Sequence, residues 1–130
     1  MIKSNKILIV DDDVDDQAFL LDAITDLYPD FACGVCKNGQ EALNHIEADP
    51  PPPQIIFLDL NMPVLNGFEF LKHYRKNKNC DQSKIIIYST SSHPRDKEIS
   101  MDLGACCYLT KLTDLSTLKK EVKGLVEKYC

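Results

Sequence analysis

The sequence ILIVDDD at residues 7–13 joins a short apolar run directly to three carboxylates. A second apolar run, IIFL at residues 55–58, leads in the same way into Asp59. In a parallel α/β sheet the carboxyl ends of the strands border the ligand crevice, so these carboxylates are expected to converge. Clustered carboxylates repel one another, and the repulsion is relieved by protonating one of them or by a hard cation with oxygen ligands, such as Mg²⁺. The sequence therefore predicts a divalent-metal site.

The composition predicts one globular domain. The chain has 130 residues, of which 44% are hydrophobic and 27% charged, which suits a single domain over residues 1–130 and leaves no room for an output domain. The net charge of −5 and the lack of a basic stripe argue against nucleic-acid binding. No apolar stretch approaches the length of a membrane span or a secretory signal. We therefore expect a cytoplasmic protein with no membrane partner.

Six cysteines raise the question of disulfide bonds or a zinc site. Cys33 and Cys36 lie in a predicted strand, where their odd spacing directs them to opposite faces. The three histidines show no metal-ligand spacing to a cysteine. Reduced, structural thiols are therefore expected at all six positions, which are Cys33, Cys36, Cys80, Cys106, Cys107 and Cys130.

Short β-branched runs alternate with helical patterns along the chain, and the runs are apolar on both faces. That pattern is typical of strands buried between two layers of helices. Five strands are predicted, at residues 7–10, 31–36, 55–58, 85–88 and 107–110. Helices are predicted at residues 15–26, 40–47, 66–76 and 94–103, and after Thr113 or Asp114 as a cap. The last helix is expected to present one stripe made of Leu115, Leu118, Val122, Leu125, Val126 and Tyr129.

Five β-α units with right-handed crossovers predict an α/β fold, a flavodoxin-like doubly wound parallel sheet in the strand order 2-1-3-4-5 with five helices. In that order the first and third strands are neighbours, so the carboxylates after Val10 and Leu58 meet at the topological switch point. A flavin or nucleotide site would need a loop rich in glycine or hydroxyl groups after the first strand. The loop here is acidic, and it would repel a phosphate unless a cation intervened.

Five elements in this order resemble the receiver domain of two-component response regulators, and the resemblance covers nearly the whole chain. They are ILIVDD at residues 7–12, LDLNMP at 58–63 followed by Gly67, YST at 88–90, GA at 104–105 and YLTK at 108–111. Each residue alone has an ordinary explanation, since Asp11 or Asp13 could cap a helix and a lysine could be solvated. The ordered combination makes the match specific.

The resemblance implies that Asp59 accepts a phosphoryl group from a histidine kinase or a histidine phosphotransfer protein. It also implies that Asp12 and Asp59 bind Mg²⁺, together with the backbone carbonyl of Asn61, and that Asp11 acts through water. A carboxylate nucleophile that attacks phosphorus in line suits such a site, because Mg²⁺ and a lysine neutralise the equatorial oxygens.

The same resemblance implies that Lys111 is the cationic clamp on the phosphoryl group. Ser89, rather than Thr90, would follow the new oxygen with its hydroxyl, and Tyr108 would change rotamer as that loop moves. The face formed by the fourth helix, fifth strand and fifth helix would then bind a downstream protein, and it is also a candidate surface for a homodimer. The chain departs from the family at Leu112, where a proline with a cis peptide bond is usual, so the Lys111–Leu112 bond is either trans or strained.

Two other functions compete with this interpretation. Asp11-x-Asp13 after a hydrophobic strand is similar to the nucleophile motif of haloacid-dehalogenase-like phosphatases, with Asp11 as nucleophile and Asp13 as general acid. Such an enzyme would also need a downstream acidic pair and a longer chain. An adaptor that ignores phosphorylation would not need the acceptor, metal and lysine residues. We therefore predict a non-enzymatic, single-domain phosphoacceptor that acts as a protein-binding switch or a phosphorelay intermediate.

Overall fold

Five parallel strands form one sheet in the order β2-β1-β3-β4-β5 in the computed structural model, which describes residues 5–76 and 83–129. The strands are β1 (Lys6–Val10), β2 (Ala32–Cys36), β3 (Ile55–Leu58), β4 (Lys84–Ser89) and β5 (Cys107–Thr110). The helices are α1 (Val14–Leu27), α2 (Gly39–Ala48), α3 (Gly67–Lys76), α4 (Pro94–Asp102) and α5 (Leu115–Tyr129). The predicted flavodoxin-like fold and strand order are confirmed.

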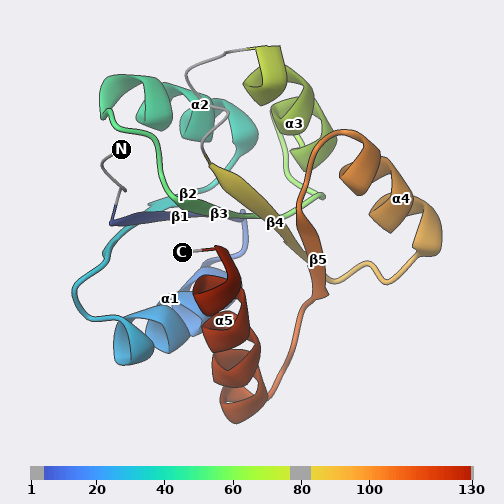
Figure 1. Cartoon of the computed structure of the whole chain (residues 1–130). Coiled ribbons are helices and arrows are strands. Elements are labelled where there is room, and N and C mark those ends of the chain that lie inside the picture. The colour runs from blue at the N-terminus through green and yellow to red at the C-terminus, as the bar shows by residue number, and fades with distance from the viewer. Residues whose placement is uncertain (1–4, 77–82, 130) are drawn as a thin grey trace.

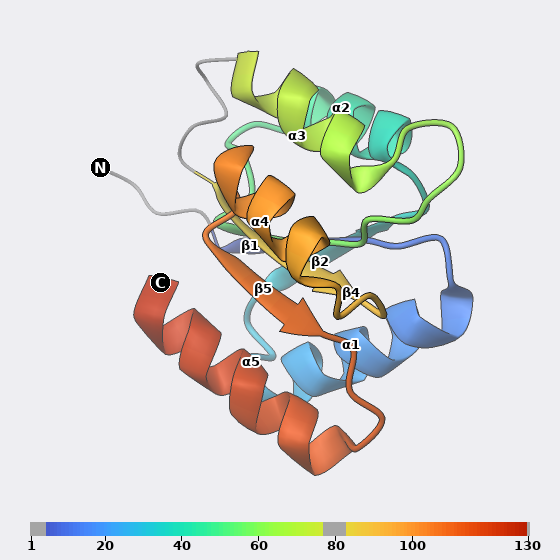
Figure 2. The same cartoon turned by 90° about the vertical axis from the view of Figure 1, so that its right-hand side faces the viewer.

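The helices lie in two layers, with α1 and α5 on one face of the sheet and α2, α3 and α4 on the other (Figures 1 and 2). The three inner strands are buried on both faces because their side chains alternate between two cores. In β1, for example, Ile7 and Ile9 pack toward α1 and α5, whereas Leu8 and Val10 pack toward α2 and α3. This arrangement explains why the inner strands read as continuous apolar runs.

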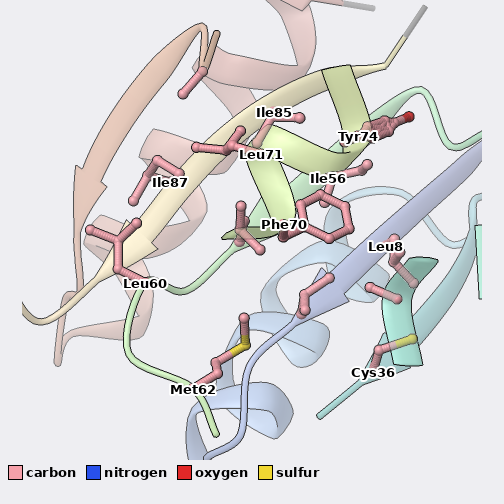
Figure 3. Close-up of a cluster of buried hydrophobic side chains, with 14 of the residues drawn as sticks. Leu8, Cys36, Ile56, Leu60, Met62, Phe70, Leu71, Tyr74, Ile85 and Ile87 are labelled. Carbon is pink, nitrogen blue, oxygen red and sulfur yellow. The ribbon is translucent and has the colours of Figure 1, made fainter. Parts of the chain in front are cut away.

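The core under α3 is built from large side chains (Figure 3). Phe70, Leu71 and Tyr74 of α3 are almost completely buried, and they lie against strand residues such as Ile56 and Ile85. Each fully buried side chain of this size contributes about 1.5–3 kcal/mol through removal of apolar surface from water. This packing holds α3 against the sheet, and with it the loop that joins the end of β3 to α3.

Side-chain caps set the beginnings of the helices. Asp13 precedes α1, and its Oδ1 accepts hydrogen bonds from the backbone nitrogens of Asp15 and Asp16 at 2.9 and 3.1 Å. Asn66 and Glu69 exchange backbone-to-side-chain hydrogen bonds at the start of α3, which is a capping box. Asp114 caps α5 by accepting from the backbone nitrogen of Thr117. The cap of α5 is therefore Asp114, one of the two predicted candidates.

Some predicted details differ at the margins of the sheet. Strands β2 and β5 are only partly buried, unlike the inner three, because each is an edge strand. Leu115 is exposed because it is the first residue of α5, whereas Leu118, Val122 and Val126 of the same stripe are buried. Cys33 and Cys36 face opposite cores, as their spacing predicted, and the four described cysteines are unpaired. Cys80 and Cys130 lie outside the described residues.

Candidate functional site

Two strand ends bring the predicted carboxylates together. The backbone nitrogen of Asp59 donates to the carbonyl of Val10 at 2.9 Å, so the residue after β3 lies beside the end of β1. The nitrogen of Asp11 donates in turn to the carbonyl of Cys36 at 3.0 Å. Carboxylate oxygens of Asp11, Asp12 and Asp59 all lie within 4.8 Å of one another. The convergence expected from the parallel sheet is therefore present.

The burial of these carboxylates perturbs their ionisation. Asp11 and Asp59 are buried, whereas Asp12 is exposed at the rim. Burial, followed by the charge of Asp11, raises the pKa of Asp59 to about 6, although Lys111 opposes the shift. Burial also raises the pKa of Asp11 against the hydrogen bond from Lys111. The site therefore holds two carboxylates whose negative charge is costly without a cation.

Lys111 supplies a positive charge at the centre of this cluster. Its Nζ lies 2.8 Å from Oδ2 of Asp11 and 3.5 Å from Oδ2 of Asp59, and it is 5.9 Å from the centroid of the Tyr88 ring. Burial by itself lowers the pKa of Lys111, but the carboxylates outweigh it and the net shift is upward, so the ammonium stays charged. The cis peptide bond of the described chain is Pro50–Pro51, so Lys111–Leu112 is trans. The missing proline therefore does not keep Lys111 from the cluster.

Asp16 belongs to the cluster and was not among the residues singled out from the sequence. Its Oδ2 lies 2.7 Å from Nζ of Lys111, which is as close as the contact with Asp11. The side chain reaches inward from the first turn of α1. The neighbouring Gln17 donates from Nε2 to the backbone carbonyl of Asp11 and so ties the same turn to the end of β1. The only signal for Asp16 in the sequence is the length of the acidic run.

The donor set fits a hard divalent cation. Three carboxylates supply oxygen atoms within reach of one another, two of them buried and one at the rim. Oxygen ligands and open positions for water or phosphate oxygens are what Mg²⁺ prefers. Asn61 follows Asp59 by two residues in the loop after β3, so its backbone lies near the same end of the sheet. Lys111 provides one positive charge, and a divalent cation would balance the remaining negative charge of these three carboxylates.

Ser89 ends β4 and Tyr108 lies inside the neighbouring strand β5, and the hydrogen bonds of both side chains go to the loop after β4 rather than to the carboxylates. Ser89 is fully buried at the end of β4, whereas Thr90 is exposed. The Ser89 hydroxyl accepts from the backbone nitrogen of Ser91 at 3.3 Å. The Tyr108 hydroxyl donates to the carbonyl of Ser91 at 2.7 Å. Both side chains are thus fastened to the β4–α4 loop.

Asp13 does not have the setting of a general acid. Its side chain is exposed, and its Oδ1 already accepts two hydrogen bonds as the cap of α1. A general acid needs a free position beside the leaving group, from which it can donate its proton. The phosphatase alternative therefore lacks its second catalytic group.

The family model of the response regulator receiver domain matches residues 7–123 of the chain. The chain belongs to this family. As a receiver domain it is 28% identical over 124 residues to the response regulator Rcp1 of Synechocystis, which covers 92% of the chain and 84% of Rcp1. It is 29% identical to a probable cyclic di-GMP phosphodiesterase of Vibrio cholerae, of which it spans only 25%.

Solved receiver structures have the same fold. The structure of the phosphorylated cyanobacterial phytochrome response regulator RcpA superposes with a TM-score of 0.86 at 29% identity, covering 97% of this chain and 94% of RcpA. A Mn²⁺-bound form of Rcp1 gives a TM-score of 0.80 at 28% identity, covering 92% and 90%. Receiver domains of two-component systems accept phosphoryl groups from histidine kinases or phosphotransfer proteins and bind a divalent metal at an acidic pocket. No helix among residues 5–76 and 83–129 is long and apolar enough to span a membrane.

Proposed function

We propose that Asp59 is the phosphoacceptor of this receiver domain and that Mg²⁺ is the metal it uses. The observation that carries the proposal is the setting of Asp59, a buried carboxylate with oxygens of Asp11 and Asp12 within 4.8 Å and Nζ of Lys111 at 3.5 Å. The solved structures of phosphorylated RcpA and Mn²⁺-bound Rcp1 support the same chemistry in similar proteins. The donor would be a histidine kinase or a histidine phosphotransfer protein.

Each residue of the site has a distinct role in phosphoryl transfer. A carboxylate oxygen of Asp59 attacks phosphorus, the new phosphorus–oxygen bond forms, and the bond to the donor histidine nitrogen breaks with its electron pair leaving on that nitrogen. Asp12 and Asp59, with Asn61 through its carbonyl and Asp11 through water, would hold Mg²⁺, which supplies charge neutralisation at the phosphoryl oxygens. Lys111, which follows β5 at the same edge of the sheet, adds a second positive charge. The protein itself contributes mainly position and electrostatics.

Phosphorylation would act through the β4–α4 loop. Ser89 and Tyr108 both bond to Ser91 in this structure, so a hydroxyl drawn toward a new phosphoryl oxygen would loosen a shared attachment. The adjoining α4 buries only Ser100 among its own residues, which indicates weak docking. A weakly docked element can be shifted by a local charge change. We infer that the face formed by α4, β5 and α5 binds the downstream protein or a second copy of the chain.

The acceptor role is tested by phosphorylation with a small phosphodonor. Wild-type protein incubated with phosphoramidate and Mg²⁺ should gain a phosphoryl group by intact mass, and Asp59→Asn should not. Asp15→Asn removes the same charge at an exposed position of α1 and serves as the control. Equal labelling of wild type and Asp59→Asn would refute Asp59 as the acceptor.

The switch is tested by hydrogen exchange with and without beryllium fluoride and Mg²⁺, which together mimic the phosphoryl group. Exchange should change between Ser89 and Lys120, the segment from the end of β4 into α5. In Lys111→Ala the same treatment should leave this segment unchanged, because the missing charge no longer fixes the phosphoryl oxygens. Changes confined to α1 and α2 would rule out this output surface.

A further inference from the structure

Three carboxylates contact Lys111, and one of them, Asp16, has no role in the proposed phosphoryl transfer. Its Nζ has contacts of 2.8 Å with Asp11 and 2.7 Å with Asp16, but the contact with Asp59 is 3.5 Å. An ammonium has three donors and no acceptor, and the two short contacts fix the direction of two of them. Asp59 therefore has the weakest hold on Lys111 in the unphosphorylated protein.

The two short partners of Lys111 differ in their exposure to water. The side chain of Asp11 is 3% exposed, whereas that of Asp16 is 37% exposed. A buried carboxylate that loses its cation keeps an uncompensated charge in a poorly solvated place, which is costly. A carboxylate near the surface is solvated again by water when its partner leaves. Asp16 is therefore the partner that Lys111 can exchange at the lower cost.

We propose that Asp16 is a positioning residue that holds Lys111 in the unphosphorylated protein and releases it to the phosphoryl oxygens. The inference rests on the proposed roles of Asp59 and Lys111. Phosphorylation adds negative charge and strong acceptor oxygens beside the ammonium. Lys111 then exchanges Asp16 for these oxygens and keeps the buried Asp11. The freed carboxylate of Asp16 lies in the first turn of α1, where the helix dipole favours a negative charge.

Asp16 consequently competes with the phosphoryl group for one cation. In Asp16→Asn the side chain keeps its size and its place in α1 but loses the charge that binds Lys111. The ammonium is then held by Asp11 and is free to turn toward Asp59. The strength of partly exposed ion pairs corresponds to roughly a threefold to fivefold change in a binding constant. The phosphoryl mimic should therefore bind Asp16→Asn more tightly than wild type by about that factor.

The experiment is a titration of the full chain with beryllium fluoride at saturating Mg²⁺, in which binding is monitored through the backbone amide chemical shifts. Asp15→Asn is the matched control, because Asp15 precedes Asp16 in the same turn, is exposed, and has no contact with Lys111 among the described residues. Asp16→Asn should bind the mimic roughly threefold to fivefold more tightly than Asp15→Asn. This comparison removes the effect of net charge, which both variants change equally.

A double-mutant cycle separates action through Lys111 from direct repulsion of the mimic by Asp16. In a Lys111→Ala background, Asp16→Asn and Asp15→Asn should change the affinity for the mimic equally, because no ammonium remains to be held. A persisting advantage of Asp16→Asn in that background would overturn the positioning role, and so would equal affinities of the two variants in the presence of Lys111. If wild type fails to bind the mimic at Asp59, the proposed function itself falls, and this inference falls with it.

Discussion

Replacing the proposed acceptor should stabilise the metal-free protein. In Asp59→Asn the oxygen that accepts the hydrogen bond from the Leu60 nitrogen at 2.8 Å is kept, and only the charge is lost. The pKa of Asp59 is raised from 3.8 to about 6 by burial and the neighbouring Asp11. The folded state thus holds the proton more tightly than the unfolded state. Ionisation of Asp59 therefore costs stability as the pH rises through the window from about 4 to about 6.

The size of the effect follows from these two pKa values. At pH 7 the shift corresponds to a penalty of about 3 kcal/mol, which Asp59→Asn removes. This shift already includes the attraction between Lys111 and Asp59, whose charged atoms are 3.5 Å apart. The free energy of unfolding should therefore rise by about 3 kcal/mol at pH 7. Near pH 4.5 the penalty is only about 1 kcal/mol, so the gain should fall to about that size there.

Urea denaturation of the metal-free proteins at the two pH values measures this effect. Asp15→Asn removes the same charge from an exposed position and should differ from wild type by less than about 0.5 kcal/mol at both pH values. Saturating Mg²⁺ should shrink the advantage of Asp59→Asn, because a metal that binds only the folded wild type stabilises it. A loss of stability at pH 7, or a gain of equal size at both pH values, would refute the reasoning.

Three further substitutions test other parts of the account. Asp12→Ala should weaken Mg²⁺ binding because it removes an oxygen ligand while relieving carboxylate repulsion, and unchanged affinity in a calorimetric titration would remove Asp12 from the metal site. Lys111→Ala should lower the metal-free free energy of unfolding by about 2 kcal/mol because buried Asp11 loses its cation, and wild-type stability in urea would show that the contact is unimportant. Val64→Gly should raise the thermal midpoint, with a gain of about 1 kcal/mol, because this exposed β-branched residue has a φ of 69°; a lower midpoint would contradict strain there.

The arrangement of the sheet could be predicted because the sequences of the inner strands indicate that both of their faces are buried. Ile7 to Val10 and Ile55 to Leu58 are apolar at every position, a pattern typical of strands covered on both faces. The edge strands gave a weaker signal, since β2 and β5 are covered less than their composition suggested. Element ends differ from the predicted ones by one residue at most, as at the start of α1, where Asp13 is the cap.

The carboxylates of the site could be predicted because strand ends meet at one edge of a parallel sheet. Asp16 could not, because an acidic residue in the first turn of a helix is favoured by the helix dipole whatever it faces. Its contact with Lys111 depends on how the first turn of α1 is aimed at the residue after β5, which is a property of the folded chain. The hydrogen bond from Tyr108 to Ser91 likewise joins positions 17 residues apart, and neither residue type indicates a contact with the other.

The most direct test of the central claim is to locate the phosphoryl group chemically. The protein is phosphorylated with phosphoramidate and Mg²⁺, the acyl phosphate is reduced with borohydride to a stable alcohol, and the modified residue is identified by peptide mass spectrometry. The account predicts modification at Asp59, at the end of the buried strand β3. Modification at Asp11 instead would contradict it and favour the phosphatase mechanism.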